Sequence, residues 1–177
     1  TFAASIKYKM KETIIILTGG GPAPGMNTVV GSIAKTFIAK GYRVLGINGG
    51  YKGIFSKNPN IVELDFILAD SIFNRGGSYL VMSRYKPTAE DFEKNFNLEL
   101  FTKNNIKLLI TIGGDDTAST ANRVAKFLHE HNHKISNIHV PKTIDNDLPL
   151  PLQRPTFGYE SAKAEGARLA TTIYEDA

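Results

Sequence analysis

The stretch TIIILTGGGPAPGMN, residues 13–27, joins a continuous β-branched and apolar run to a glycine-rich turn. Such a run is typical of a strand that is buried on both faces, as in a parallel sheet. Apolar side chains then recur at helical spacing from Val29 to Ile38, with Asn27 as the expected N-cap and Gly41 as the expected stop. This part of the chain therefore predicts a strand, a tight turn and a helix.

The same alternation continues along the chain. Further strands are expected at residues 42–47, 106–112 and 138–140, helices at 65–73, 88–104 and 118–128, and an extended segment at 79–82. Strands that alternate with helices predict an α/β fold with a doubly wound, mostly parallel sheet and helices on both faces. Ligands bind beyond the carboxyl ends of the strands in such sheets. The glycine-rich and aspartate-rich segments of this chain all follow predicted strands.

Composition narrows the class of protein. The chain has 177 residues, of which 42% are hydrophobic and 21% charged, so a disordered tail or linker is excluded. A domain of this length buries roughly 70% of the surface of its unfolded chain. The absence of cysteine excludes a disulfide scaffold, a thiolate zinc site and a cysteine nucleophile. All four histidines lie within residues 129–139, and His129 to His133 are interpreted as a solvated helix end rather than a metal site.

Charge and the two ends of the chain bear on partners and location. Twenty-one Lys and Arg against 17 Asp and Glu give a net charge of +4, and the basic residues are scattered, so no nucleic-acid partner is expected. No apolar run approaches the ~20 residues of a membrane span and no signal peptide is recognisable, so we expect a cytoplasmic protein without a membrane partner. The chain starts at Thr1 and stops within a helical pattern. These ends suggest a fragment, or the ordered portion, of a longer protein.

The first chemically informative cluster is the turn at residues 18–27. Its glycines permit close approach of a ligand to the backbone, and the helix that follows favours an anion at its N-terminus. Pro24 occupies the third glycine position of a dinucleotide fingerprint, and Met26 rather than Lys follows Gly25, so neither that motif nor a P-loop is present. A phosphate cradle is favoured over a purely structural tight turn.

The second cluster, residues 113–117, places Asp115 and Asp116 side by side after a buried strand. Two carboxylates at a phosphate site would repel the substrate unless a cation lay between them, which points to Mg²⁺. The alternative is that one of them merely caps the next helix.

The third cluster, residues 141–147, combines the ammonium of Lys142, the hydroxyl of Thr143 and the carboxylates of Asp145 and Asp147. In an extended segment Thr143, Asp145 and Asp147 would point the same way. Such a group supplies a general base, an acceptor that orients it, and a cation for phosphate oxygens.

Four motifs together resemble the phosphofructokinase family, in the order found in that family. They are Gly20–Asn27, Asn74–Gly77, Gly113–Thr117 and Pro141–Asp147. The last motif is highly specific, whereas the first two would be weak alone. Relatives of NAD kinase and diacylglycerol kinase share the glycine–aspartate loop but lack the segment from Lys142 to Asp147.

The resemblance implies a role for each matching residue. It places Gly21, Arg75, Asp116 and Lys142 at the phosphoryl donor and Asp115 at Mg²⁺. It makes Asp145 the base that takes the proton from the 1-hydroxyl of fructose 6-phosphate, with Lys142, Thr143 and Asp147 in the catalytic group. Thr143, Ile144 and Asp145 would contact the sugar phosphate. Ser83 and Arg84 are as compatible with positive charge near the donor as with plain surface.

The resemblance also bears on the donor. ATP-using bacterial members carry glycine at the positions of Asp116 and Lys142, and the pyrophosphate-using branch resembles this chain at both. Some ATP-dependent members keep the lysine, so Asp116 carries most of the discrimination. We therefore expect pyrophosphate as the donor, with an ATP-dependent 6-phosphofructokinase or a catalytically silent regulatory subunit as alternatives.

The resemblance further bears on domain organisation. It makes residues 1–177 the donor-binding and Mg²⁺-binding α/β domain with its catalytic loop. The family's second, sugar-phosphate-binding domain is absent from this chain. A homo-oligomer is expected at full length.

Overall fold

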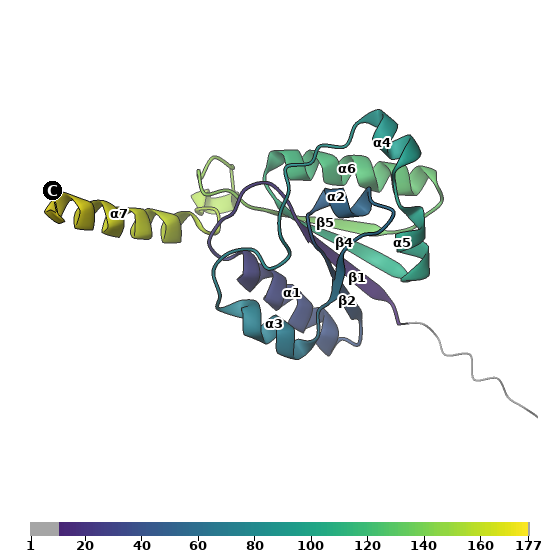
Figure 1. The fold of residues 1–177 in the computed structure, drawn as a ribbon, viewed down its shortest axis with the longest axis horizontal. Coiled ribbons are helices and arrows are strands. Elements are labelled where there is room, and N and C mark those ends of the chain that lie inside the picture. The colour runs from purple at the N-terminus through teal and green to yellow at the C-terminus, as the bar shows by residue number, and fades with distance from the viewer. Residues whose placement is uncertain (1–10, 177) are drawn as a thin grey trace, which may run out of the picture.

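The computed structural model describes residues 11–176 and contains one five-stranded sheet with the order β3-β2-β1-β4-β5 (Figure 1). Its strands are β1 (Thr13–Thr18), β2 (Arg43–Ile47), β3 (Ile61–Glu63), β4 (Ile106–Gly113) and β5 (Ser136–Pro141). β1, β2, β4 and β5 run parallel, and only the short edge strand β3 is antiparallel. The predicted doubly wound, mostly parallel sheet is confirmed, whereas β3 was not predicted.

Helices cover both faces of the sheet (Figure 1). One face carries α1 (Met26–Ala39) and α3 (Phe66–Phe73), and the other carries α2 (Tyr51–Ile54), α4 (Ala89–Lys94), α5 (Leu98–Lys103) and α6 (Asp115–Glu130). Successive side chains of β1 pack into the hydrophobic cores on opposite faces of the sheet. Ile14 and Ile16 pack on the α1 side, and Ile15 and Leu17 pack on the α6 side. The unbroken apolar run is therefore explained by burial on two faces.

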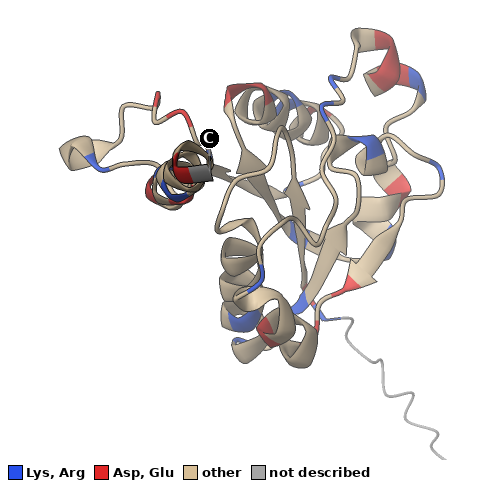
Figure 2. Cartoon of the chain, turned by 60° about the vertical axis from the view of Figure 1, so that its left-hand side comes forward, with Lys and Arg blue, Asp and Glu red and all other residues tan. Residues whose placement is uncertain are grey.

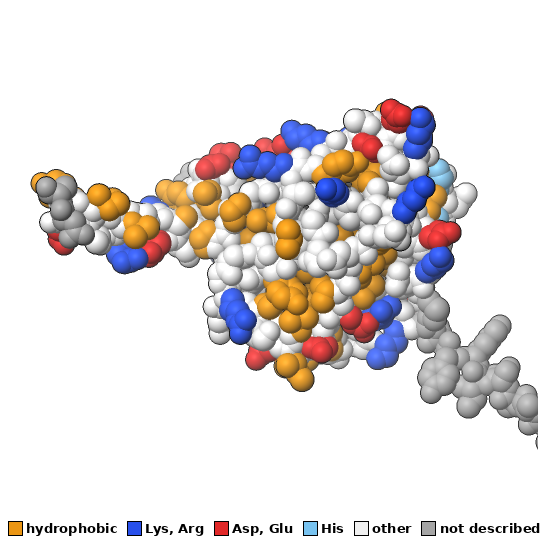
Figure 3. Space-filling view, in the orientation of Figure 1, with side chains coloured by type: hydrophobic (Ala, Val, Ile, Leu, Met, Phe, Trp, Pro, Cys, Tyr) orange, Lys and Arg blue, Asp and Glu red, His pale blue; other side chains and the backbone are white. Residues whose placement is uncertain are grey.

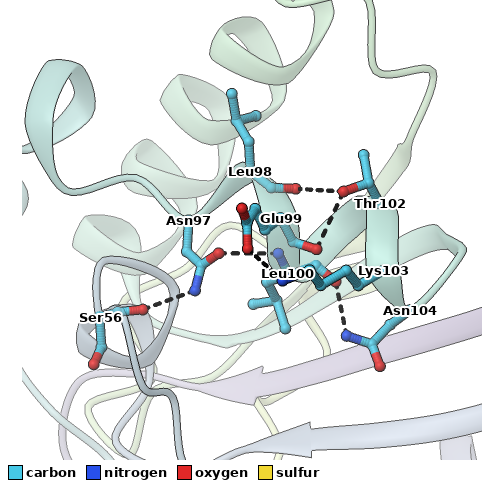
Figure 4. Close-up of polar contacts among 8 residues, drawn as sticks. All are labelled: Ser56, Asn97, Leu98, Glu99, Leu100, Thr102, Lys103 and Asn104. Atoms are coloured by element: carbon cyan, nitrogen blue, oxygen red, sulfur yellow. Dashed lines mark hydrogen bonds and ion pairs between the residues drawn. The ribbon is translucent and has the colours of Figure 1, made fainter.

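The single helix predicted for residues 88–104 is wrong, because the segment forms α4 and α5 with a break between them. Thr88 does begin α4, through a capping box with Asp91. The break occurs at Asn97, whose side chain accepts a hydrogen bond from Leu100 N at 3.0 Å and donates one to Ser56 O at 2.9 Å (Figure 4). A second N-cap within the apolar pattern thus starts a new helix.

The expected capping role of Asn27 is also wrong. The residue that precedes α1 is Gly25, with a φ of 89°, and no side chain caps this helix. Asn27 lies inside α1, where the residue is 4% exposed and its side-chain amide donates to the carbonyls of Arg75 and Gly76, each at 3.0 Å. Its Oδ1 accepts from Tyr79 N at 2.7 Å. The side chain therefore fixes the loop after α3 against the first turn of α1.

The segment predicted to be extended, Tyr79–Met82, forms a turn instead. Val81 N donates to Ser78 O at 3.2 Å, and Val81 has a φ of 49°. Gly49 N donates to the carbonyls of both Leu80 and Val81, which ties this turn to the loop after β2. The turn directs the chain toward the carboxyl end of β1, where Gly19 and Ser83 form an isolated parallel bridge.

The last helix, α7 (Tyr159–Asp176), follows a short 3₁₀ turn at Pro151–Gln153 and projects away from the sheet (Figure 1). Residues 163–175 are all exposed, and hydrophobic side chains on this helix, including Leu169 and Ile173, face solvent (Figure 3). Within residues 11–176, none of the helices combines the length and the apolar character that a membrane span requires.

Replacing Asn27 tests its role in holding the loop. Asn27→Ala leaves two carbonyls and one amide without their partner, so we expect a loss of about 2–3 kcal/mol in free energy of unfolding. The control is Thr36→Ala, because Thr36 is on the same helix and its exposed hydroxyl bonds only to Ser32 O. That variant should change stability by less than about 0.5 kcal/mol. Urea denaturation measures the free energy of unfolding of both variants. Equal losses in the two would contradict the role of Asn27 in holding the loop.

Candidate active site

A cavity of about 750 Å³ lies beyond the carboxyl ends of β1, β4 and β5. Four segments provide most of its lining: residues 20–22, 83–86, 114–117 and 142–148. Three of them directly follow a strand of the parallel sheet, as the fold class predicts. The fourth, residues 83–86, reaches the cavity through the bridge between Gly19 and Ser83.

The ends of β1 and β4 meet tightly at this cavity. Gly19 N donates to Ile112 O at 2.9 Å, and the buried side chain of Thr117 fills the space beside both Gly19 and Gly113. A Cβ on Gly19 would come within 2.7 Å of Thr117 Oγ1, so a larger residue does not fit there without a shift. This close packing positions the glycine-rich loop against the first turn of α6.

The carbonyl of Gly113 joins three elements. It accepts Lys142 N at 2.8 Å and His139 Nε2 at 3.1 Å. Because a carbonyl only accepts, His139 carries its proton on Nε2, and Nδ1 accepts from Thr111 Oγ1 at 2.9 Å. Burial lowers the pKa of His139, although the Gly113 carbonyl and the Asp115 charge oppose that shift. The neutral ring thereby fixes the turn that carries Asp115.

Lys142 is the most enclosed charged group at the cavity, with 7% of its surface exposed. Its Nζ donates to Gly21 O at 2.7 Å and so holds the glycine-rich loop. Burial lowers the pKa of this ammonium below its usual value of 10.5, while Asp145 raises it and Arg84 lowers it. The sequence predicted Lys142 as a cation for the donor but did not predict this contact with Gly21.

Arg84 is the second cation beside Gly21. Its Nη2 lies 3.4 Å from where a Cβ on Gly21 would stand, and it lines the cavity together with Ser83. Arg75 is not among the lining residues, and its carbonyl is held by Asn27 on the α1 side. The predicted contact between Arg75 and the donor therefore stays a prediction.

The two acidic residues after Gly114 begin α6, and both line the cavity. In Figure 2 the ribbon is red, for acidic residues, at the start of α6 and in the loop that follows β5, at the same end of the sheet. Neither Asp115 nor Asp116 caps the helix, so the capping alternative is wrong. Their position in the first turn is favoured by the helix dipole. Asp116 forms an ion pair with Lys86 at 2.8 Å, which sequence reasoning missed.

The loop after β5 is bent rather than extended, so the predicted alternation of its side chains is wrong. Thr143 Oγ1 accepts Asp145 N at 3.0 Å, and Asn146 has a φ of 55°. Thr156 closes the loop by donating through Oγ1 to Thr143 O at 2.6 Å. Thr143, Ile144, Asp145 and Asp147 nevertheless all line the cavity together with Lys142.

The metal-binding capacity of the cavity rests on carboxylates. Among residues 11–176 no three or more His, Cys, Asp or Glu side chains come together in a group that could enclose a metal. Mg²⁺ is usually held by one or two carboxylates together with substrate phosphates, and Asp115 fits such a site. His129 and His131 are exposed at the end of α6, which confirms the interpretation of that stretch as a solvated helix end.

Known proteins resemble this chain in sequence. The family model described as Phosphofructokinase matches residues 13–177. The chain is 44% identical over 170 residues to a pyrophosphate–fructose 6-phosphate 1-phosphotransferase of Naegleria fowleri, covering 96% of this chain and 38% of that protein. It is 40% identical to the enzyme of that name from Thermotoga maritima, covering 94% of this chain and 39% of that protein. The chain thus spans about two fifths of the length of these relatives.

Similarity extends to proteins named for another donor. An ATP-dependent 6-phosphofructokinase of Ligilactobacillus salivarius is 39% identical over 138 residues, which cover 78% of this chain and 41% of that protein. Among solved structures, the phosphofructokinase of Saccharomyces cerevisiae superposes with a TM-score of 0.80 at 21% identity, covering 94% of this chain and 24% of that one. This structural likeness supports the fold.

The burial of Lys142 gives a prediction about stability and pH. Lys142→Met removes a buried charge with its single bond to Gly21, so we expect the free energy of unfolding at pH 7 to fall by less than about 1 kcal/mol. In the wild type, the unfolded state binds more protons than the folded state between the lowered pKa and 10.5. The wild type should therefore gain stability relative to Lys142→Met as the pH rises toward 10.5. Urea denaturation from pH 7 to 10 measures this, and a relative loss would contradict it.

Proposed function

The chain belongs to the phosphofructokinase family, and on that premise we propose that it forms the donor side and catalytic loop of an enzyme that transfers a phosphoryl group from pyrophosphate to the 1-hydroxyl of fructose 6-phosphate. The observation that carries the proposal is the convergence of Gly21, Asp115, Lys142 and Asp145 on one cavity. A phosphate cradle, a carboxylate suited to Mg²⁺, a fixed cation and a candidate base are the parts that phosphoryl transfer uses.

We assign the donor end of the cavity to Gly21, Arg84 and Lys142. The backbone of the glycine-rich loop lies against the start of α6. Lys142, from the loop after β5, and Arg84, from the segment before α4, both lie beside Gly21. Asp115 would hold Mg²⁺, which when bound neutralises charge on the transferred phosphoryl group. Arg84 is added to Arg75, the cation expected from the sequence, as a candidate for the donor phosphates, since Arg84 lines the cavity.

The acceptor end is assigned to the loop after β5. Asp145 would accept the proton of the sugar 1-hydroxyl, because its carboxylate is exposed to the cavity and its backbone is fixed by Thr143. Thr143 and Ile144 would contact the sugar phosphate, and Asp147 would complete the polar wall. Lys142 lies between the two ends, bonded to the donor loop and under the influence of the Asp145 charge.

Pyrophosphate is favoured as the donor by Asp116. A nucleotide carries an α-phosphate and a nucleoside beyond the two phosphates that pyrophosphate also has, and Asp116 narrows the space that they would need. The ion pair with Lys86 weakens the like-charge part of this argument and leaves the steric part. The two relatives named for pyrophosphate, at 44% and 40% identity, support the same choice.

The remaining expectations concern the whole protein. A second domain that completes the sugar site fits the share of the relatives' length that this chain spans. A cytoplasmic homo-oligomer is part of the same proposal. An ATP-dependent enzyme is the second candidate, because a relative named for ATP matches at 39% identity. A silent regulatory subunit is less well supported, since Asp115 and Asp145 both line the cavity.

Assays with each donor test the proposal. The complete polypeptide that carries this chain should turn over fructose 6-phosphate with pyrophosphate and Mg²⁺, and prefer pyrophosphate to ATP. Asp116→Gly should shift the ratio of kcat/KM toward ATP by about tenfold or more, because a steric obstacle is removed. A wild-type preference for ATP would overturn the donor assignment and leave family membership intact.

Replacing the candidate base tests the acceptor end. Asp145→Asn should lower turnover by roughly 10²–10⁴-fold while pyrophosphate binding, measured by calorimetry, stays within a few fold. Asp70→Asn is a matched control, since Asp70 is an exposed aspartate paired with Lys35 on the far side of the sheet. Turnover of Asp145→Asn close to that of this control would refute the assignment.

A further inference from the structure

We propose that Lys86 favours binding of the donor by acting through Asp116, because its ammonium neutralises that carboxylate and so lets an anionic donor approach it. The inference rests on the proposed function, since it concerns the same cavity. Both side chains line the cavity, and Lys86 Nζ lies 2.8 Å from Asp116 Oδ2.

The backbone around Lys86 is held from both sides. On one side, Ser83 Oγ donates to Gly49 O at 2.7 Å, and Gly20 N donates to Ser83 O at 3.1 Å. On the other side, Arg123 Nη1 donates to Pro87 O at 2.7 Å. Because these bonds fix the short segment that carries Lys86, the segment presents the lysine to the first turn of α6.

Arg123 is itself restrained, which strengthens that geometry. Its guanidinium lies 4.8 Å from the centre of the Phe92 ring, within the range of a cation–π interaction. Tyr85 packs on Phe55 with ring centres 5.7 Å apart. Lys86 and Asp116 therefore pair between the loop before α4 and the first turn of α6, two parts of the cavity wall that Arg123 of α6 also joins through Pro87.

The pair matters through charge rather than through stability. Its side chains are 64% and 74% exposed, and exposed ion pairs contribute little to folding. A carboxylate that lines a phosphate site, however, repels the donor when its charge is not balanced. Lys142 bonds to Gly21, and Arg84 lies beside the same glycine. The cation that pairs with the Asp116 carboxylate is Lys86. Lys86 thus decides how much of the Asp116 charge the donor experiences.

A double-mutant cycle tests this role in the complete polypeptide. Wild type, Lys86→Met, Asp116→Asn and the double variant are compared by steady-state kinetics with the donor that the wild type uses. Lys86→Met should raise KM for the donor by about 3- to 10-fold with kcat nearly unchanged, because the unbalanced carboxylate repels the free donor. The double variant should match Asp116→Asn, since no carboxylate remains to be unmasked. Added salt should reduce the effect of Lys86→Met.

The control is Lys94→Met, because Lys94 is a comparably exposed lysine paired with Glu90 outside the cavity. Its KM for the donor should equal that of the wild type. An unchanged KM in Lys86→Met would overturn the proposal. An equal rise in the presence and absence of Asp116 would also overturn it, since Lys86 would then contact the donor directly. A wild type that uses only ATP would refute the proposed donor, while the same cycle run with ATP still decides the role of Lys86.

Discussion

The close packing of the carboxyl ends of β1 and β4 is the constraint on which the candidate site depends. Thr117 occupies the space beside Gly19 and Gly113, and the Gly113 carbonyl then accepts both Lys142 N and the His139 ring. Three segments that are far apart in the sequence are thereby brought to one cavity. A side chain on either glycine would separate them, so the glycines are required for this arrangement and not only for turning the chain.

The elements that follow from local patterns were predictable. The apolar run of β1 required burial on two faces, and a parallel sheet provides it. Predictions failed where a polar side chain had two possible partners. Asn27 is of a residue type that often caps helices, but it forms long-range hydrogen bonds to the loop after α3. Asn97 caps a helix that begins inside a continuous apolar pattern. Only the position of the partner segment decides such cases, and that position is a tertiary property.

The same reasoning explains which site residues the sequence could place. Gly21, Asp115, Lys142 and Asp145 stand directly after strands, so the topology alone brings them together. The segment with Arg84 and Lys86 follows no parallel strand and reaches the cavity through a turn stabilised by Gly49. For that reason the sequence left Arg84 undecided between a donor contact and plain surface and did not single out Lys86.

The cavity therefore contains two kinds of positive charge. Lys142 is buried and bonded to Gly21, so its position is fixed before any donor arrives, and its desolvation strengthens its interaction with a nearby anion. Arg84 and Lys86 are exposed, and their side chains can rearrange at little cost in stability. A fixed cation suits the charge that develops during transfer, whereas exposed cations suit capture and release. The proposed phosphoryl transfer would use both, because charges that bind the donor and the transition state equally tightly do not raise kcat.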